Sequence, residues 1–194
     1  MQKKKNIQLL FALAMVIALI ALLPLLKKKD SGLKVDRHLF TLGAQTVITD
    51  VILKTDSATN KLSYVNGKWR VNDKYDLDLS MRDVFFSVLS QMEIKRPIAE
   101  SQSDSIAQTI LNKGVEVAIL NNADTVKSYS IWGDKNSESS FIMGTNNQPC
   151  LIHIPGYRSY VAGIFEVPES DWRTRRVFSA TYTNLNELKL EYSD

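Results

Sequence analysis

Residues 61–71 read KLSYVNGKWRV, and this stretch predicts a β-hairpin. Two short runs of strand-forming residues flank the pair Asn66-Gly67. Both members of such a pair accept the positive φ angles of a tight two-residue turn. Upstream, residues 46–53 (TVITDVIL) are mostly β-branched or aliphatic, which favours a further strand. We therefore expect this part of the chain to form antiparallel sheet.

The segment after the hairpin predicts a helix with one apolar face. Residues 80–83 (SMRD) have the form of a capping box that begins at Ser80. Apolar residues then recur at helical spacing: Met81, Val84, Phe85, Val88, Leu89 and Met92. We expect these six side chains to face the core of the domain.

A second, shorter helix is predicted at residues 104–113. Its apolar residues Ile106, Ile110 and Leu111 are expected to point inward. Gly114 follows at the position where a helix commonly ends in a left-handed residue, so we expect a positive φ there.

Strand signals dominate the rest of the chain, and they define the fold class. A hairpin is predicted at 115–120 and 125–132, a strand pair at 140–143 and 150–154, a short helix at 157–165 and a closing strand at 185–192. Strands outnumber helices, and no long alternation of strand and helix is present. The expected fold is α+β, with mostly antiparallel sheet and two or three packed helices.

The N-terminal part predicts a membrane anchor. Residues 7–26 (IQLLFALAMVIALIALLPLL) carry no charge and have the length of a transmembrane helix, with three lysines on each side. No small-residue cleavage site follows them, and no cysteine is placed to accept a lipid, so an uncleaved anchor fits better than a signal peptide. The expected organisation is a basic tail (1–6), an anchor (7–26) in contact with the lipid bilayer, a polar linker (27–38) and one domain (39–194).

The charge distribution argues against nucleic-acid binding. The chain has a formal net charge of +3, but six lysines precede Asp30. From Asp30 onward there are 18 basic and 21 acidic residues, a balance of −3. A nucleic-acid-binding domain needs a basic patch of its own. Beside Arg173, Arg175 and Arg176, Trp172 is therefore expected to pack inward, and one of these arginines to pair with a neighbouring carboxylate or carbonyl instead.

The residues that usually carry chemistry are few and dispersed. The one cysteine, Cys150, excludes an intramolecular disulfide and a cysteine-based zinc site, and we expect it to be buried as a small apolar residue. His38 and His153 are expected to be packed or hydrogen-bonded and not to act as ligands or bases. No nucleophile elbow, phosphate-binding loop or metalloprotease motif is present.

The acidic run from Asp73 through Asp76 to Asp78 does not fit a calcium site. It lacks the spacing, the glycine and the final glutamate of an EF-hand loop, so a solvated turn is the better interpretation. The sequence thus predicts no catalytic, metal-binding or cofactor-binding residues.

Three segments together resemble a bacterial family of domains of unknown function. They are residues 66–75 (NGKWRVNDKY) with the helix after them and Arg96-Pro97, residues 153–157 (HIPGY) with 163–165 (GIF), and residues 172–178 (WRTRRVF). The resemblance extends from about residue 39 to 192. It implies a membrane-anchored envelope protein of Gram-negative bacteria, with related domains found beside components of gliding-motility-type ABC transporters. It supplies no catalytic residues, and it implies structural roles for Trp69, Pro155, Gly156, Trp172 and Arg173.

These observations leave two main hypotheses and one minor one. The first is a non-enzymatic envelope protein whose domain binds another protein, for example a component of a transporter or secretion assembly. The second is a small-ligand or glycan-binding domain that uses the aromatic residues Trp132, Tyr157, Tyr160 and Trp172 as stacking surfaces. An enzyme of unfamiliar type is the third.

The expected location is the inner membrane, crossed once, with the domain in the periplasm. The lysines at positions 3–5 favour a cytoplasmic N-terminus, whereas those at 27–29, with Lys34 and Arg37, favour the opposite orientation. The short tail, which is similar to the basic start of a secretory signal, and the family resemblance favour the periplasmic side.

Overall fold

The computed structural model describes residues 35–158 and 160–176, together with Asn6, residues 13–16, Thr183, Glu187, Lys189 and Glu191. The fold belongs to a compact unit that begins at Val35. Within the described residues, no helix combines the length and the apolar character needed to span a bilayer. Apart from the positions just named, the predicted anchor at 7–26 and the predicted strand at 185–192 lie outside the described residues.

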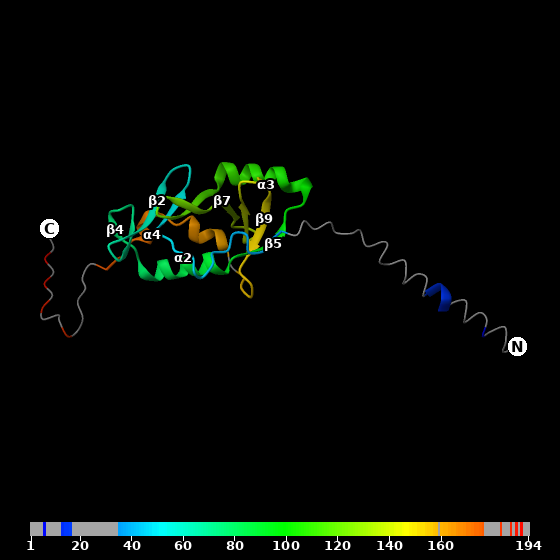
Figure 1. The fold of residues 1–194 in the computed structure, drawn as a ribbon, viewed down its shortest axis with the longest axis horizontal. Helices are drawn as coiled ribbons and strands as arrows, with labels where there is room; N and C mark the ends of the chain where they lie inside the picture. The colour runs from blue at the N-terminus through cyan, green and yellow to red at the C-terminus, as the bar shows by residue number, and fades with distance from the viewer. Residues whose placement is uncertain are drawn as a thin grey trace. The chain divides into compact units, whose positions relative to one another are not determined.

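The described part of the domain is built on a nine-stranded sheet in which every pairing is antiparallel (Figure 1). The strand order is β4-β3-β2-β1-β6-β7-β8-β9-β5. The strands are β1 Asp50–Lys54, β2 Thr59–Val65, β3 Lys68–Val71, β4 Tyr75–Asp76, β5 Glu93–Pro97, β6 Val115–Asn121, β7 Asp124–Asp134, β8 Ser139–Met143 and β9 Pro149–His153. This confirms the predicted α+β class with a mostly antiparallel sheet.

The hairpins form where their turn residues predicted them. Asn66 and Gly67 have φ angles of 52° and 81°, and Val65 pairs with Lys68 across the turn between β2 and β3. The β6–β7 hairpin turns through Asn122, which also has a positive φ, of 55°. In both turns the residue types that tolerate the left-handed region occupy the positions that require it.

Strands β4 and β5 are the two edges of the sheet, and the sequence predicted neither of them. Helix α2 (Leu79–Gln91) connects one edge to the other. In a flat sheet the edge strands would be eight spacings apart, roughly 38 Å, whereas a 13-residue helix is about 20 Å long. The sheet therefore curves around α2, and the fold can close into one core.

Helix α2 begins one residue before the predicted capping box. The N-cap is Asp78, whose Oδ1 accepts hydrogen bonds from the backbone N–H groups of Ser80 (3.0 Å) and Met81 (3.1 Å). The prediction of Ser80 as the cap was wrong, because an aspartate two residues earlier makes the same kind of bond with a charged acceptor.

Helix α3 (Glu100–Lys113) starts four residues before its predicted start and buries Ile110. Leu111, which was expected to point inward, is 58% exposed. Gly114 is extended, with φ −79°, so the left-handed end was also wrong. A Cβ at Gly114 would lie 2.4 Å from the backbone oxygen of Ile110, so glycine is required here by close packing.

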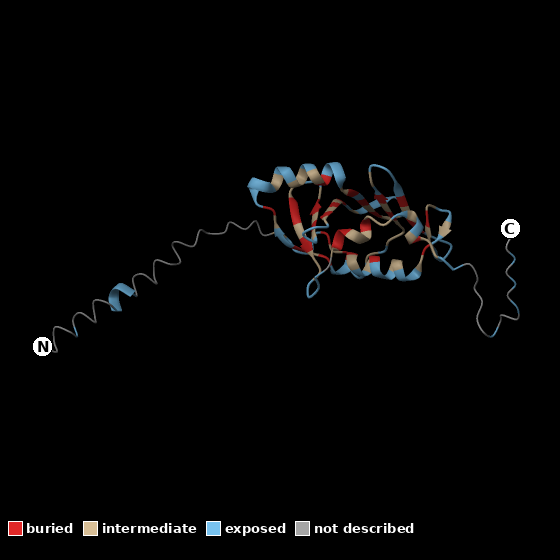
Figure 2. Ribbon diagram, turned by 180° about the vertical axis from the view of Figure 1, so that it is seen from behind, coloured by how far each residue is buried: buried red, intermediate tan, exposed pale blue. Residues whose placement is uncertain are grey.

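The two long helices cover opposite faces of the sheet (Figure 1). Phe85 of α2 packs against Phe165 (ring centroids 5.5 Å apart) and Trp172 (5.2 Å). Helix α3 packs on β7, β8 and β9 from the other side. Figure 2 shows the buried residues gathered on the strands between the two helices, with the outer sides of both helices exposed.

The segment after β9 is less helical than predicted. Of the described residues between 157 and 165, Val161–Phe165 form a helix, the 3₁₀ helix η1. A four-residue helix, α4 (Glu169–Trp172), follows it and places Trp172 in the core. The indole N–H of Trp172 donates to the carbonyl of Val167 at 3.1 Å, which satisfies its one polar group.

Candidate functional site

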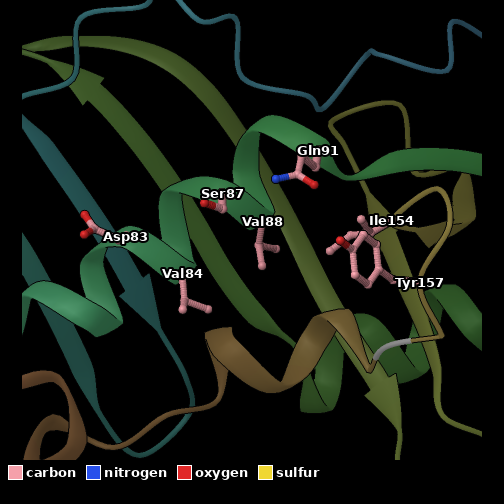
Figure 3. Close-up of a pocket in the computed structure, with 7 residues that line it drawn as sticks. All are labelled: Asp83, Val84, Ser87, Val88, Gln91, Ile154 and Tyr157. Carbon is pink, nitrogen blue, oxygen red and sulfur yellow. The ribbon is translucent and has the colours of Figure 1, made fainter.

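An open apolar groove of about 380 Å³ runs beside α2 (Figure 3). Five of its seven lining residues come from α2, and the other two, Ile154 and Tyr157, come from the turn after β9. Val84 and Val88 point to the same side of the helix, and Tyr157 lies beyond its C-terminal end. The remaining lining residues are Asp83, Ser87 and Gln91.

The groove exists because the apolar stripe of α2 is wider than the core requires. Phe85 and Leu89 are fully buried against the sheet. At 100° per residue, Val84 and Val88 lie roughly 60–140° around the helix from them. Val84 is 53% exposed, so its predicted place in the core was wrong, and Val88 is only half-buried. The stripe thus has one side for the core and one for the groove.

The opposite wall depends on a tight turn at Pro155-Gly156. Gly156 has a φ of +80°, which L-residues rarely adopt, and the N–H of Tyr157 donates to the carbonyl of Ile154 at 3.1 Å. This turn presents Tyr157 with 69% of its surface exposed. Pro155 and Gly156, for which the resemblance implied structural roles, therefore set the position of a groove residue.

The polar atoms of the groove are few and do not converge. Asp83, the one ionisable carboxylate of the lining, is bound to the neighbouring Arg82, whose Nη2 lies 2.7 Å from Oδ1. The other polar lining residues, Ser87 and Gln91, are on the same helix. A catalytic site needs a nucleophile or base held against an orienting partner, and the lining residues do not supply that pair. Their chemistry is suited to binding apolar side chains.

Three of the residues with expected structural roles make contacts elsewhere in the domain. Trp69 packs between Tyr64 (5.7 Å between ring centroids) and Phe86 (5.1 Å). Trp172 has no exposed surface. The guanidinium of Arg173 lies 4.9 Å from the ring centroid of Tyr75, a cation–π contact.

The neighbouring arginine forms an ion pair of the expected kind. Arg175 Nη2 lies 2.9 Å from Asp171 Oδ1. Because the two groups are four residues apart and largely exposed, the pair contributes little to stability. Arg173 and Arg175 thus each contact a nearby side chain at the end of α4.

The four aromatic residues considered for stacking do not share one surface. Trp172 is in the core, and Trp132 stacks on Phe141 of β8 at 5.5 Å between centroids. Tyr160 donates a hydrogen bond to Glu166 Oε1 at 2.9 Å, and burial, followed by this bond, raises the pKa of Tyr160. Of the four, Tyr157 is the one that projects into solvent.

Both histidines lie beside Glu93, although they are 115 positions apart in the sequence. His38 Nδ1 lies 3.8 Å from Glu93 Oε1, and Glu93 pairs directly with His153 between β5 and β9. In the described part of the chain, no group of three or more His, Cys, Asp and Glu side chains is arranged to hold a metal ion.

The other candidate groups are separated by the fold. Cys150 is buried, as expected, and this burial raises the pKa of its thiol. Of the acidic run, Asp73 lies 3.6 Å from Lys61 Nζ, Asp76 lies 3.9 Å from Arg70 Nε, and Asp78 caps α2. These carboxylates have separate partners and do not form a cation site.

A larger hollow, of about 510 Å³, lies between α3 and the sheet. Its wall on α3 consists mainly of Ser101, Gln102 and Ser105, and its sheet side holds the half-buried Phe141 and Leu151. No strongly exposed apolar side chain projects into it, so the α2 groove is the better candidate for a docking surface.

Comparison of the chain with protein-family models, curated proteins and solved structures finds no match. The family resemblance based on residues 66–75, 153–157 and 172–178 therefore stays a prediction.

Proposed function

We propose that this chain is a membrane-anchored, non-enzymatic envelope protein whose domain binds another protein through the α2 groove. The observation that carries the proposal is the exposure of Val84 and Tyr157 on either side of an apolar depression. Complete burial of a fully exposed apolar side chain is worth about 1.5–3 kcal/mol, and Val84 and Tyr157 still expose 53% and 69% of their surface. The groove is therefore suited to take an apolar side chain of a partner as an anchor within a wider contact.

The lining chemistry favours a protein over a small polar ligand. A site for a sugar or metabolite orients its ligand with several convergent polar groups. Here Asp83 is already paired with Arg82, and the apolar lining comes from Val84, Val88, Ile154 and Tyr157. A periplasmic small-ligand or glycan-binding domain remains the alternative, with Tyr157 as its exposed aromatic surface.

The test is site-specific photocrosslinking in intact cells. A photoreactive residue replaces Val84, and a matched control replaces Leu111, an aliphatic residue of similar exposure on the helix that covers the other face of the sheet. We expect a protein adduct from position 84 that is lost on adding Tyr157→Asp, and none from position 111. Equal labelling from both positions would contradict the proposal. Binding on a glycan array that Tyr157→Ala abolishes would favour the alternative.

A further inference from the structure

The hollow between α3 and the sheet has an apolar floor that ends at an arginine. Arg96 of β5 pairs with Leu151 of β9, and Leu151 pairs with Phe141 of β8. Residues that pair directly across antiparallel strands share one face of the sheet, and all three line the hollow. Phe141 is also stacked on Trp132, at 5.5 Å between ring centroids. A charged group therefore lies at one end of a row of half-buried apolar side chains.

The N-terminal part of α3 does not cover this floor with apolar side chains. Helix α3 packs on β7, β8 and β9 (Figure 1), but its first six residues, 100–105, read ESQSDS. Ser101, Gln102 and Ser105 line the hollow, and Ile106 is the first apolar residue of the helix to do so. The result is a space of about 510 Å³, which lies within the size range of small-molecule sites.

Most of the polar side chains around the hollow are available to a ligand. In the described part of the chain, the side chains of Ser101, Gln102 and Ser105 form no hydrogen bond with other residues. The hydroxyl of Ser139, on β8, donates to the carbonyl of Ser137 at 3.3 Å and can still accept. Hydroxyl and amide groups from the helix and from the sheet thus border the same space.

Arg96 is the one ionisable residue of the lining. Among the described residues no carboxylate forms an ion pair with it. Its Nη1 donates to the adjacent carbonyl of Pro97 at 3.4 Å, which leaves the other N–H groups of the guanidinium. The acidic residues Glu100 and Asp104 of α3 lie roughly 160° around the helix from Gln102, so they face away from the hollow. The lining therefore carries one uncompensated positive charge.

This combination of charge and apolar surface indicates the chemistry of the ligand. A carboxylate can bind a guanidinium through two parallel hydrogen bonds. An aromatic or aliphatic body can cover Phe141 and Leu151, which are half-buried in the absence of a ligand. A neutral sugar would leave Arg96 without a counter-charge, and a polyphosphate would bring several charges to one arginine. A ligand with one negative charge and an apolar body suits both parts of the hollow.

We propose that the hollow between α3 and the sheet binds a small carboxylic acid with an apolar body. Arg96 binds the carboxylate, and Phe141 and Leu151 contact the body. The site is independent of the proposed protein partner, because α3 and α2 cover opposite faces of the sheet.

The test is a titration of the full-length chain with phenylacetate, followed by NMR of its isoleucine methyl groups. The chain is held in lipid nanodiscs, because detergent would compete for an apolar floor. Ile98 and Ile106 line the hollow, whereas Ile154 lines the α2 groove and is the internal control. We expect saturable shifts at Ile98 and Ile106, with a dissociation constant of about 5 mM or lower for an acid of this size, and none at Ile154. Absence of saturation at Ile98 and Ile106 up to about ten times that concentration would overturn the proposal.

Two related probes separate the charge from the apolar body. Phenylacetamide has the same body without the charge, and acetate has the charge without the body. Each should bind at least about tenfold more weakly than phenylacetate, because each loses one of the two contacts. An amide or an acetate that binds as tightly as phenylacetate would contradict the proposed chemistry.

A pair of variants assigns the charge to one side chain. Arg96→Gln should raise the dissociation constant of phenylacetate at least about tenfold. Lys95→Gln, which removes the neighbouring exposed cation of β5 outside the lining, should change it less than about twofold. Both positions are exposed, and unchanged methyl spectra without ligand confirm that the fold is kept. Equal effects of the two variants would remove Arg96 from the site and overturn the proposal.

Discussion

At the scale of single residues, the core is organised around Phe85. Its ring contacts those of Phe165, Trp172 and Phe86, all within 5.8 Å between centroids. Phe86 is on the same helix, α2, whereas Phe165 and Trp172 belong to η1 and α4, so one side chain joins α2 to a segment about 80 positions later in the sequence.

We therefore expect Phe85→Ala to lower the free energy of unfolding by about 3–5 kcal/mol, because it leaves a large cavity in a close-packed core. Val84→Ala, on the adjacent and exposed position, should change it by less than about 0.5 kcal/mol. Urea denaturation followed by tryptophan fluorescence measures both. Similar midpoints for the two variants would show that the core faces of α2 are assigned wrongly.

Tyr129 has a buried hydroxyl with no hydrogen-bond partner among the described residues. Burial also raises the pKa of Tyr129, because the charged form loses its hydration. An unpartnered buried hydroxyl costs about 1–3 kcal/mol. Tyr129→Phe should therefore leave the thermal unfolding temperature unchanged or raise it. A clear decrease would reveal a partner for the hydroxyl, such as a buried water.

At the scale of elements, the start of α2 depends on one carboxylate. Asp78→Ala should lower the free energy of unfolding by about 1 kcal/mol, because two N–H groups at the helix start lose their acceptor. Ser80→Ala is the matched control and should have little effect, since its backbone N–H, and not its side chain, makes the cap bond. Equal losses for the two variants in thermal unfolding would restore Ser80 as the cap.

The elements that the sequence predicted well are those with local signals. Asn66-Gly67 and Asn122 adopt positive φ angles in their turns. Asparagine and glycine tolerate such angles better than other residues, so the sequence indicates both turns. The apolar residues of α2 recur at helical spacing, so the helix was predicted although its first residues were misplaced. The residue preferences of turns and the spacing of apolar residues in a helix depend on a few neighbouring residues. Turns and helices can therefore be predicted from the sequence without knowledge of the fold.

Strands β4 and β5 had no such signal. β4 has two residues, and β5 (EIKRP) has only one buried apolar side chain, that of Ile94. β5 is a strand because β9, more than 50 positions away, pairs with it. β4 pairs with the preceding strand β3, but through two residues only. Charged residues and a proline are common on edge strands, where they discourage further pairing. Composition alone therefore did not indicate β5 as a strand.

At the scale of the whole molecule, residues 35–194 should fold without the N-terminal segment. The compact unit begins at Val35, and its described residues already form one sheet packed on one hydrophobic core. Expression of residues 35–194 should give a protein with one cooperative thermal transition. Aggregation without any transition would show that the fold depends on residues 1–34.

The membrane orientation is the second prediction at this scale. We expect the domain on the periplasmic side, because the basic N-terminal tail is short and the family resemblance indicates an envelope protein. A reporter that is active only in the periplasm, fused after Asp194, should be active, and a cytoplasm-only reporter at the same position should not. The opposite result would place the domain in the cytoplasm, as the lysine count after residue 26 favours.

The sequence by itself determined the antiparallel character of the sheet, its hairpins and the existence of α2. Only the tertiary structure decided that β5 forms one edge of the sheet, that α2 connects the two edge strands, and that Val84 lines a groove in place of the core. The physical reason is the range of the interactions. A turn or a helix is stabilised by residues a few positions away. Which apolar side chains of a helix become buried depends instead on the distant elements that pack against it.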